Sequence, residues 1–234
     1  MLARSVFTGR YGGASGGAFA ELNLAEHVGD DARAVAENRR RVAVHAGLDP
    51  VRVVWMDQVH GAGVTVVDGP TDVPLPATDG VVTIALDLAV AVLVADCVPV
   101  LLSDAEAGVI GDAHAGRAGV EAGVVPAVVT AMVHLGAEPA RIRAQLGPAV
   151  CGRCYEVPAA MAEAVVAVAP DARSRTRQGN PALDLRAGVR GQLGRAGVGT
   201  VVEVGGCTVE DPGLYSYRRD GVTGRFAGLV WLEP

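Results

Sequence analysis

One apolar segment constrains the fold of this chain more than any other feature. Residues 88–102 are rich in β-branched and aliphatic side chains, residues 103–108 have the composition of a turn, and residues 109–114 resume the apolar pattern. Apolar runs of this kind on either side of turn residues predict a strand, a turn and a second strand. We therefore expect a β-hairpin over residues 88–114.

The hairpin brings two reactive side chains together. In an antiparallel pair the numbers of facing residues have a constant sum, so a turn centred near residues 105 and 106 places Cys97 opposite His114. The Cβ atoms of directly opposed residues lie roughly 4.5 to 5.5 Å apart. A thiolate and an imidazole at that distance either bind one metal ion or form a nucleophile and its base. A third candidate ligand, His60, lies upstream.

Packing alone is the competing interpretation of these residues. A free cysteine in an apolar strand is more often a small buried hydrophobe than a catalyst, and a single histidine is more often a hydrogen-bonded core residue. The surrounding sequence favours chemistry, because Asp96 places a charge inside the apolar run directly before Cys97. A buried charge costs free energy unless it is paired or hydrogen-bonded, so strands that serve packing alone rarely carry one.

Composition narrows the class of protein. A chain of 234 residues, half of them hydrophobic, can bury a full core, and we expect one domain over residues 1–234. The net charge of -6 argues against a nucleic-acid partner and favours a small-molecule substrate. The apolar runs are shorter than the roughly 20 residues that cross a bilayer, and the N-terminus lacks the pattern of a signal peptide. We expect a cytoplasmic protein without a membrane partner.

The remaining cysteines carry a weaker signal. A reducing compartment disfavours a disulfide framework. Cys151 and Cys154 have the C-x-x-C spacing, but no second C-x-x-C or H-x-x-x-H follows at the spacing of a zinc finger. Cys207 is interpreted as a packed residue. The sequence therefore gives these three cysteines no firm chemical role.

Helices and strands are expected in irregular order. Asp30 and Asp31 are good N-cap residues for a helix that ends near Ala46. Further helices are predicted over residues 120–136, 158–169 and 184–196, where Pro126 either kinks the first of these or marks its first turn. Strands are predicted over residues 51–58, 201–204 and 226–232. The lack of strict alternation favours an α+β fold with mixed sheets over a doubly wound parallel sheet.

Several motifs carry a resemblance to a known family. They are Gln58-Val-His-Gly61, Ala95-Asp-Cys-Val-Pro-Val-Leu-Leu102, His114-Ala-Gly116, Leu146-Gly-Pro-Ala-Val-Cys-Gly152 with Cys154-Tyr-Glu-Val157, and Tyr215-Ser-Tyr-Arg-Arg-Asp-Gly-Val-Thr-Gly-Arg225. With Leu22-Asn-Leu24, His27-Val-Gly-Asp30 and Glu37-Asn-Arg39 they extend nearly end to end. The sequence resembles the bacterial YfiH family, whose members have been labelled multicopper polyphenol oxidases or laccase-domain proteins.

The resemblance implies a fold, a metal and an activity. The fold is a sandwich-like α+β core with mixed sheets flanked by helices, and one zinc ion is bound by residues matching His60, Cys97 and His114. Three protein ligands leave an open fourth position, as in a catalytic zinc site. The implied activities are phosphorolysis of adenosine, inosine and methylthioadenosine, and deamination of adenosine. The partners are then a purine nucleoside and phosphate, with the protein a monomer or small homo-oligomer.

Four further residues are candidates for binding polar groups of the substrate: Asn38, Arg39, Gln58 and Arg219. One departure from the family pattern bears on the substrate as well. The family sequence that begins at the histidine is usually His-Ala-Gly-Trp-Arg-Gly, whereas this chain has Arg117 and Ala118 in place of Trp-Arg. The change leaves the metal ligands intact and affects the expected substrate contacts.

Three other functions remain open. Two histidines and one cysteine also bind a single blue-copper ion, so a copper-dependent polyphenol oxidase is an alternative. A multicopper cluster is disfavoured, because the chain has five histidines and His27, His45 and His134 lie in unrelated segments. The family resemblance also suggests a hydrolase that uses Cys97 and His114 to edit a peptidoglycan precursor, and such an enzyme would need no metal. The last alternative is an interaction module that zinc stabilises without catalysis.

Overall fold

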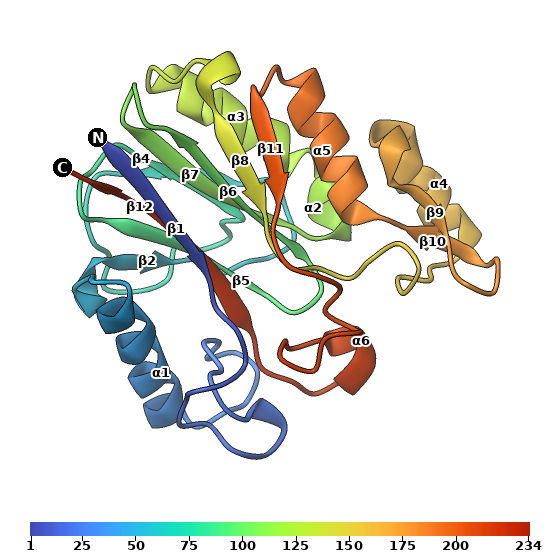
Figure 1. Cartoon of the computed structure of the whole chain (residues 1–234), viewed down its shortest axis with the longest axis horizontal. Helices are drawn as coiled ribbons and strands as arrows, with labels where there is room; N and C mark the ends of the chain where they lie inside the picture. The colour runs from blue at the N-terminus through green and yellow to red at the C-terminus, as the bar shows by residue number, and fades with distance from the viewer.

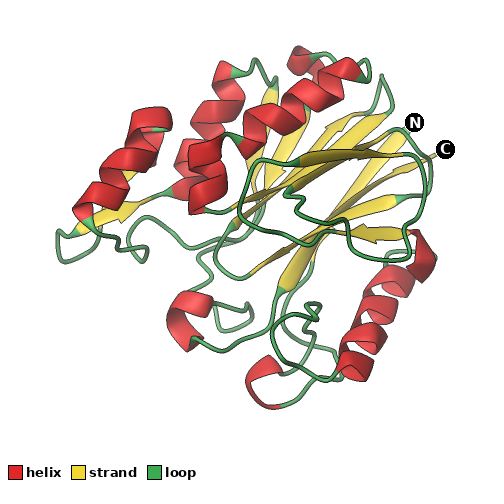
Figure 2. Ribbon diagram, turned by 180° about the vertical axis from the view of Figure 1, so that it is seen from behind, coloured by secondary structure: helices red, strands yellow, loops and turns green.

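The computed structural model describes residues 1–234 and contains two β-sheets packed face to face between helices (Figure 1 and Figure 2). The four-stranded sheet has the order β1 (Leu2–Phe7), β12 (Phe226–Glu233), β5 (Ala89–Val94) and β2 (Val53–Trp55). The six-stranded sheet has the order β11 (Thr200–Glu203), β8 (Arg143–Leu146), β6 (Val98–Asp104), β7 (Val109–Ala115), β4 (Gly80–Thr83) and β3 (Val64–Val67). Both sheets mix parallel and antiparallel neighbours, which confirms the predicted α+β fold with mixed sheets.

Helices cover the two outer faces of the sandwich. Helix α1 (Ala32–His45) packs on the four-stranded sheet, and α2 (Arg117–Ala122), α3 (Val124–His134) and α5 (Leu185–Arg195) pack on the six-stranded one. Helix α4 (Ala159–Val168) packs beside α2, next to the hairpin of β9 (Arg173–Arg175) and β10 (Pro181–Leu183), and α6 (Tyr217–Asp220) precedes β12. Short 3-10 turns cover Gly17–Phe19, Pro50–Arg52, Pro139–Arg141 and Pro170–Ala172. None of the helices has the length and apolar character needed to cross a membrane.

The alternation of side chains along the strands explains this layering. In β5, Val90, Val92 and Val94 lie in the core between the sheets, whereas Ala89 and Leu93 lie in the core beneath α1. Successive strand residues point to opposite faces, so a strand that is apolar at every position is buried on both faces. The continuous apolar sequence of β5 therefore belongs to a central strand of a helix-covered sandwich.

The predicted strand over residues 88–102 is wrong, because the chain breaks at Asp96 into β5 and β6, which belong to different sheets. Asp96 has a positive φ of 96°. Its carboxylate accepts hydrogen bonds from Thr208 Oγ1 at 2.6 Å, Ser216 Oγ at 2.7 Å and the Arg218 amide at 2.7 Å. These donors satisfy the buried charge, and the turn carries the chain from one sheet to the other.

The predicted register of the hairpin is also wrong. Pro99, and not Cys97, faces His114, because the turn is centred one residue later than expected. The residue that faces His114 is thus two positions later in the sequence than expected. Residues two positions apart in a strand point to the same face of the sheet. Cys97 and His114 therefore still share the inner face of the six-stranded sheet, on which Leu101 and Ile110 pack.

Most of the predicted helices and strands are confirmed, with changed boundaries. Asp31 caps α1 by accepting from the Arg33 amide at 2.9 Å. The helix predicted over residues 120–136 is two helices, α2 and α3, separated at Gly123, whose φ is +84°. Pro126 lies in the first turn of α3, where its missing N–H has no helical partner to lose. The strand predicted over residues 51–58 shortens to β2, because Pro50 opens a 3-10 turn.

Candidate metal centre

The three predicted ligands converge at one end of the sandwich. Their ligand atoms, from His60, Cys97 and His114, all lie within 4.8 Å of one another. Cys97 Sγ is 3.8 Å from His60 Nε2, and the two imidazole centroids are 4.6 Å apart. Bonds of about 2.0 to 2.3 Å in a tetrahedron place zinc ligands about 3.3 to 3.8 Å from one another. Two imidazoles and one thiol at these separations fit a zinc ion.

The ligands come from both sheets. His60 follows β2 of the four-stranded sheet, and His114 is near the end of β7 in the six-stranded sheet. Cys97 lies in the crossing between β5 and β6, just after Asp96. The turn at Asp96 thus delivers Cys97 to the place where the ends of the two sheets meet.

Asp79, which directly precedes β4, positions two of the ligands. Its buried carboxylate accepts hydrogen bonds from the backbone amides of Val59 at 3.2 Å, His60 at 2.9 Å and Gly61 at 2.7 Å. These bonds hold the loop in which His60 has a positive φ of 60°. Nδ1 of His114 lies 2.9 Å from the same carboxylate. A carboxylate on one imidazole nitrogen directs the other nitrogen toward a metal, so Nε2 of His114 would be the ligand atom.

Charges within the cluster favour the thiolate. Burial alone would raise the pKa of Cys97, but His114 and His60 outweigh it and lower that pKa to about 6. Burial lowers the pKa of His114, whereas the Cys97 thiolate and Asp79 raise it to about 9. Burial also acts to raise the pKa of Asp79, yet the hydrogen bonds from His114 and the amides hold it below its ordinary value. Thiolates bind metals, and a metal ion would displace the His114 proton.

The cluster opens into a cavity of about 490 Å³, within the ~300 to 1,000 Å³ range of small-molecule sites. Besides the cluster itself, the charged and aromatic part of its lining consists of His27, Asp96, Arg117, Tyr155, Tyr217, Arg218 and Arg225. His60 is exposed, Cys97 is half-buried and His114 is buried. A metal ion held by these three residues would have room for a fourth ligand from the cavity, as in catalytic zinc sites.

Gln58 is the one predicted substrate-binding residue that lines this cavity. Its side-chain amide donates to the Leu93 carbonyl at 2.8 Å and accepts from the Leu93 amide at 2.8 Å. The Gln58 side chain therefore uses both its nitrogen and its oxygen to pair with the backbone of β5 at the cavity wall.

Asn38 and Arg39 lie away from the cavity, on α1. Asn38 is fully buried and donates to Ser15 Oγ at 2.9 Å and to the Asn23 carbonyl at 2.9 Å. The Arg39 guanidinium lies over the Trp55 ring at 4.3 Å and donates to the Leu24 carbonyl at 2.9 Å. The structure gives both residues contacts that fix the N-terminal segment and does not bring them to the metal ligands.

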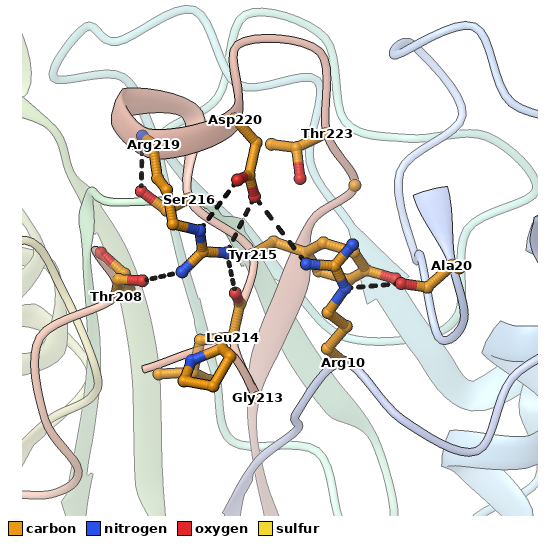
Figure 3. Close-up of polar contacts among 12 residues, drawn as sticks. Arg10, Ala20, Thr208, Gly213, Leu214, Tyr215, Ser216, Arg219, Asp220 and Thr223 are labelled. Carbon is orange, nitrogen blue, oxygen red and sulfur yellow. Dashed lines mark hydrogen bonds and ion pairs between the residues drawn. The ribbon is translucent and has the colours of Figure 1, made fainter. Parts of the chain in front are cut away.

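Arg219 also lies outside the cavity lining, in the network shown in Figure 3. Its guanidinium donates to the carbonyls of Thr208 and Leu214, each at 2.8 Å, and to the Asp220 carboxylate. Arg10 approaches the same carboxylate at 3.8 Å. Arg219 thereby holds the segment between β11 and α6.

Sequence reasoning missed several residues of the site: Asp79, His27, Tyr155, Arg218 and Arg225. Four of them had a usable signal, because each belongs to a motif that carries the family resemblance: Arg218 and Arg225 to Tyr215–Arg225, Tyr155 to Cys154–Val157 and His27 to His27–Asp30. Asp79 had a weaker signal, a charge directly before the apolar strand Gly80–Thr83.

Gly116 leaves room for two of the ligands, which gives a test of the site. A Cβ atom on Gly116 would lie 2.8 Å from His60 Cδ2 and 3.0 Å from Cys97 Sγ. We expect Gly116→Ala to displace both side chains and lower zinc affinity by about 10- to 100-fold, the cost typical of disturbing ligand support. Competitive titration with a chromophoric chelator measures the affinity.

Gly194→Ala is the matched control for this substitution. A Cβ atom there meets nothing within 4 Å, and alanine favours the α5 helix. Zinc affinity should stay at the wild-type value. An unchanged affinity in Gly116→Ala would mean that the site tolerates a separation of His60 and Cys97 larger than the structure shows.

A two-sheet sandwich with a cluster of two histidines and one cysteine at one end defines the class of protein. The family model described as "Multi-copper polyphenol oxidoreductase laccase" matches residues 4–233. A protein named YfiH from Bacillus licheniformis superimposes with a TM-score of 0.91 at 32% identity, covering 99% of this chain and 93% of that one. YlmD from Geobacillus stearothermophilus gives a TM-score of 0.91 at 33% identity, covering 99% and 92%. The chain belongs to the YfiH family.

Curated relatives have a different name from the family model. A protein of Streptomyces coelicolor named purine nucleoside phosphorylase is 58% identical over 228 residues, which cover 97% of this chain and 94% of that protein. A purine nucleoside phosphorylase of Streptomyces griseus is 55% identical over 233 residues, covering 99% and 95%. The chain is thus similar over nearly its whole length to proteins named for phosphorolysis.

Proposed function

We propose that this chain is a zinc-dependent purine nucleoside phosphorylase that acts on adenosine, inosine and methylthioadenosine and also deaminates adenosine. One observation carries the proposal: the His60–Cys97–His114 cluster opens into a cavity that three arginines and two tyrosines also line. Phosphate needs cations, and a purine ring needs a flat apolar surface. The names of the close relatives support the same reaction.

Arg218 and Arg225 are the proposed phosphate ligands. Arg225 is half-buried and holds its guanidinium with hydrogen bonds to the carbonyls of Thr223 at 2.9 Å and Gly224 at 3.0 Å. Arg218 lies over the Tyr155 ring at 5.0 Å. Guanidinium groups bind phosphate through paired N–H donors, and both arginines keep N–H groups beyond those used in these bonds.

Tyr155 and Tyr217 are the proposed surfaces for the purine base. Both rings line the cavity, and each is approached by an arginine: Arg218 over Tyr155 at 5.0 Å and Arg225 over Tyr217 at 5.9 Å. Aromatic side chains prefer offset or edge contacts with other rings. A nucleoside stacked here would place its ribose between the base pocket and the phosphate ligands.

The proposed reaction exchanges one bond at the ribose. A phosphate oxygen forms a bond to the anomeric carbon, the bond from that carbon to the purine nitrogen breaks, and the purine nitrogen takes up a proton. Fixing phosphate and nucleoside in one cavity removes much of the entropic barrier. When bound, zinc would supply a Lewis acid that polarises a substrate oxygen or acidifies a water for deamination.

A product assay tests this proposal. The purified protein, with zinc and copper quantified per chain, is incubated with adenosine in the presence and absence of phosphate. We expect adenine that depends on phosphate, and inosine that does not. Inosine as the starting nucleoside should give hypoxanthine. If neither adenosine nor inosine yields any of the products adenine, inosine and hypoxanthine, the purine assignment is wrong.

Arg225→Gln is expected to raise the KM for phosphate by about 10- to 100-fold while the zinc content stays unchanged. The estimate follows from the ~1.5 to 3 kcal/mol that hydrogen bonds to charged groups contribute. Initial rates at varied phosphate and saturating nucleoside measure it. Arg52→Gln is the matched control, because Arg52 also donates to two carbonyls, those of Leu86 and Asp87, but does not line the cavity. A normal phosphate KM in Arg225→Gln would remove Arg225 from the phosphate site.

A thiol hydrolase is the second candidate function, favoured by one observation. Asp79, His114 and Cys97 are arranged in the order of a carboxylate, an imidazole and a nucleophile, which is the arrangement of catalytic triads. Such an enzyme would edit a peptidoglycan precursor and keep its activity in a chelator. A multicopper oxidase has less support, since His45 and His134 lie outside the cavity lining.

A further inference from the structure

A second cluster of metal-binding side chains lies outside the cavity. The ligand atoms of Cys151, Cys154, Cys207 and Glu210 all lie within 4.8 Å of one another. None of these residues lines the cavity. The interpretation of Cys207 as a packed residue is therefore incomplete: it is buried, and it also faces the C-x-x-C pair from a distant part of the chain.

Two turns of the same kind build this cluster. The Cys151 carbonyl accepts from the amides of Cys154 at 2.9 Å and Tyr155 at 3.0 Å. The Cys207 carbonyl accepts from the amides of Glu210 at 3.1 Å and Asp211 at 3.0 Å. Each turn presents a ligand at its first and fourth residue. The C-x-x-C pair thus has a partner that zinc-finger spacing does not reveal, because its partner is C-x-x-E.

Backbone contacts hold the two turns against each other. Ala149 and Cys207 form a parallel bridge, with the Thr208 amide donating to the Ala149 carbonyl at 3.2 Å. The Cys151 amide also donates to Cys207 Sγ at 3.3 Å. The four ligands are therefore brought together by the fold itself.

We propose that Cys151, Cys154, Cys207 and Glu210 form a second, structural zinc site. Three thiolates and one carboxylate complete a tetrahedron without water, which is the composition of a closed structural site. Soft thiolate donors select zinc over magnesium or calcium. Arg177, whose guanidinium is 2.6 Å from Glu210 Oε1, offsets part of the negative charge.

A disulfide explains the cluster less completely. It would join two of the three cysteines, leave the third thiol unused, and give no role to Glu210, whose Oε1 lies 3.5 Å from Cys154 Sγ. A zinc ion uses all four side chains.

The proposed zinc would fix one wall of the cavity. The first turn lies between Val150 and Tyr155, both of which line the cavity, and the second turn precedes Tyr217 and Arg218, which line it as well. The two turns follow β8 and β11, which pair in parallel at the edge of the six-stranded sheet. A metal that ties them together would hold Tyr155 and Arg218 at the distance that the structure shows.

Metal stoichiometry tests the proposal independently of the first site. The wild-type protein and its Cys97→Ala variant are purified under reducing conditions. The zinc content of each is measured by elemental mass spectrometry. We expect about two zinc ions per wild-type chain and about one in Cys97→Ala. A Cys97→Ala protein without zinc overturns the second site, and a wild-type protein whose zinc content Cys97→Ala does not change overturns the first.

Cobalt gives a readout that reports the ligands. In the Cys97→Ala background every remaining thiolate-to-cobalt charge-transfer band must come from the second site. In this background we expect a strong near-ultraviolet band. Adding Cys207→Ser should abolish the band. Adding Glu210→Gln should keep the band but weaken the cobalt affinity by at least about 10-fold. Glu156→Gln, a change at an exposed carboxylate on the same segment, should leave the affinity unchanged.

Two results would overturn the proposal without any variant at the second site. One is the absence of a cobalt band in Cys97→Ala. The other is an intact mass of the freshly purified protein lower by two hydrogens, with two fewer titratable thiols, since that result means a disulfide. If Cys207→Ser does not fold, Cys154→Ser replaces it, because Cys154 is half-buried whereas Cys207 is buried.

Discussion

Cys97→Ala is expected to lose the proposed zinc ion at the His60–Cys97–His114 cluster and to lower kcat/KM for phosphorolysis by at least about 100-fold. The substitution removes the only sulfur ligand of the proposed site and leaves two imidazoles, one on the loop after β2 and one on β7. Loss of a residue that merely supports a ligand costs about 10- to 100-fold in affinity or activity, so loss of a ligand should cost more. Zinc per chain and initial rates with adenosine and phosphate measure both effects.

Chelation of the wild-type protein completes this test, because a thiol nucleophile would also be lost in Cys97→Ala. We expect a strong chelator to remove the phosphorolysis activity and added zinc to restore it. A thiol hydrolase with the Asp79–His114–Cys97 arrangement would keep its activity in the chelator. Turnover that Cys97→Ala leaves unchanged would contradict every mechanism centred on this site.

Asp79→Asn is expected to lower zinc affinity by about 10- to 100-fold and to destabilise the fold by about 2 to 4 kcal/mol. The native carboxylate accepts from the backbone amides of Val59, His60 and Gly61 and contacts Nδ1 of His114. An asparagine amide turns one accepting oxygen into a donor that faces other donors. Chelator competition measures the affinity, and urea unfolding measures the stability.

Asp104→Asn separates the two effects of this substitution. Asp104 is fully buried and accepts from the amides of Glu106 at 3.2 Å, Ala107 at 3.1 Å and Glu138 at 2.9 Å, but it does not line the cavity. Its asparagine variant should lose a similar amount of stability and keep wild-type zinc affinity. Equal zinc affinity in the wild type and in Asp79→Asn would show that the carboxylate does not support the ligands.

Local sequence signals predicted those parts of the fold that depend on neighbouring residues. The N-cap at Asp31 and the apolar strand Phe226–Glu233 are examples, because capping and strand propensity act over a few residues. The break at Asp96 was not predictable in this way. The donors that stabilise its carboxylate, Thr208 and Ser216, are more than a hundred residues away in the chain.

The candidate site divides along the same line. The identities of His60, Cys97 and His114 came from their residue types and motifs, and the structure brings them together. The carboxylate that supports these residues was not predicted, because Asp79 and His114 are 35 residues apart in the chain. The substrate candidates Asn38 and Arg39 do not line the cavity. Both residues stand out in the motif Glu37-Asn-Arg39, but their side chains hold the N-terminal segment.

The origin of the ligands in both sheets has a consequence for folding. Neither the four-stranded sheet, which leads to His60, nor the six-stranded sheet, which holds His114, carries a complete set of ligands. A metal ion therefore cannot template either sheet on its own, and the centre forms only after the two sheets have docked. Small changes in the apolar layer between the two sheets would then alter the distance between His60 and His114. The affinity for the ion would change with that distance.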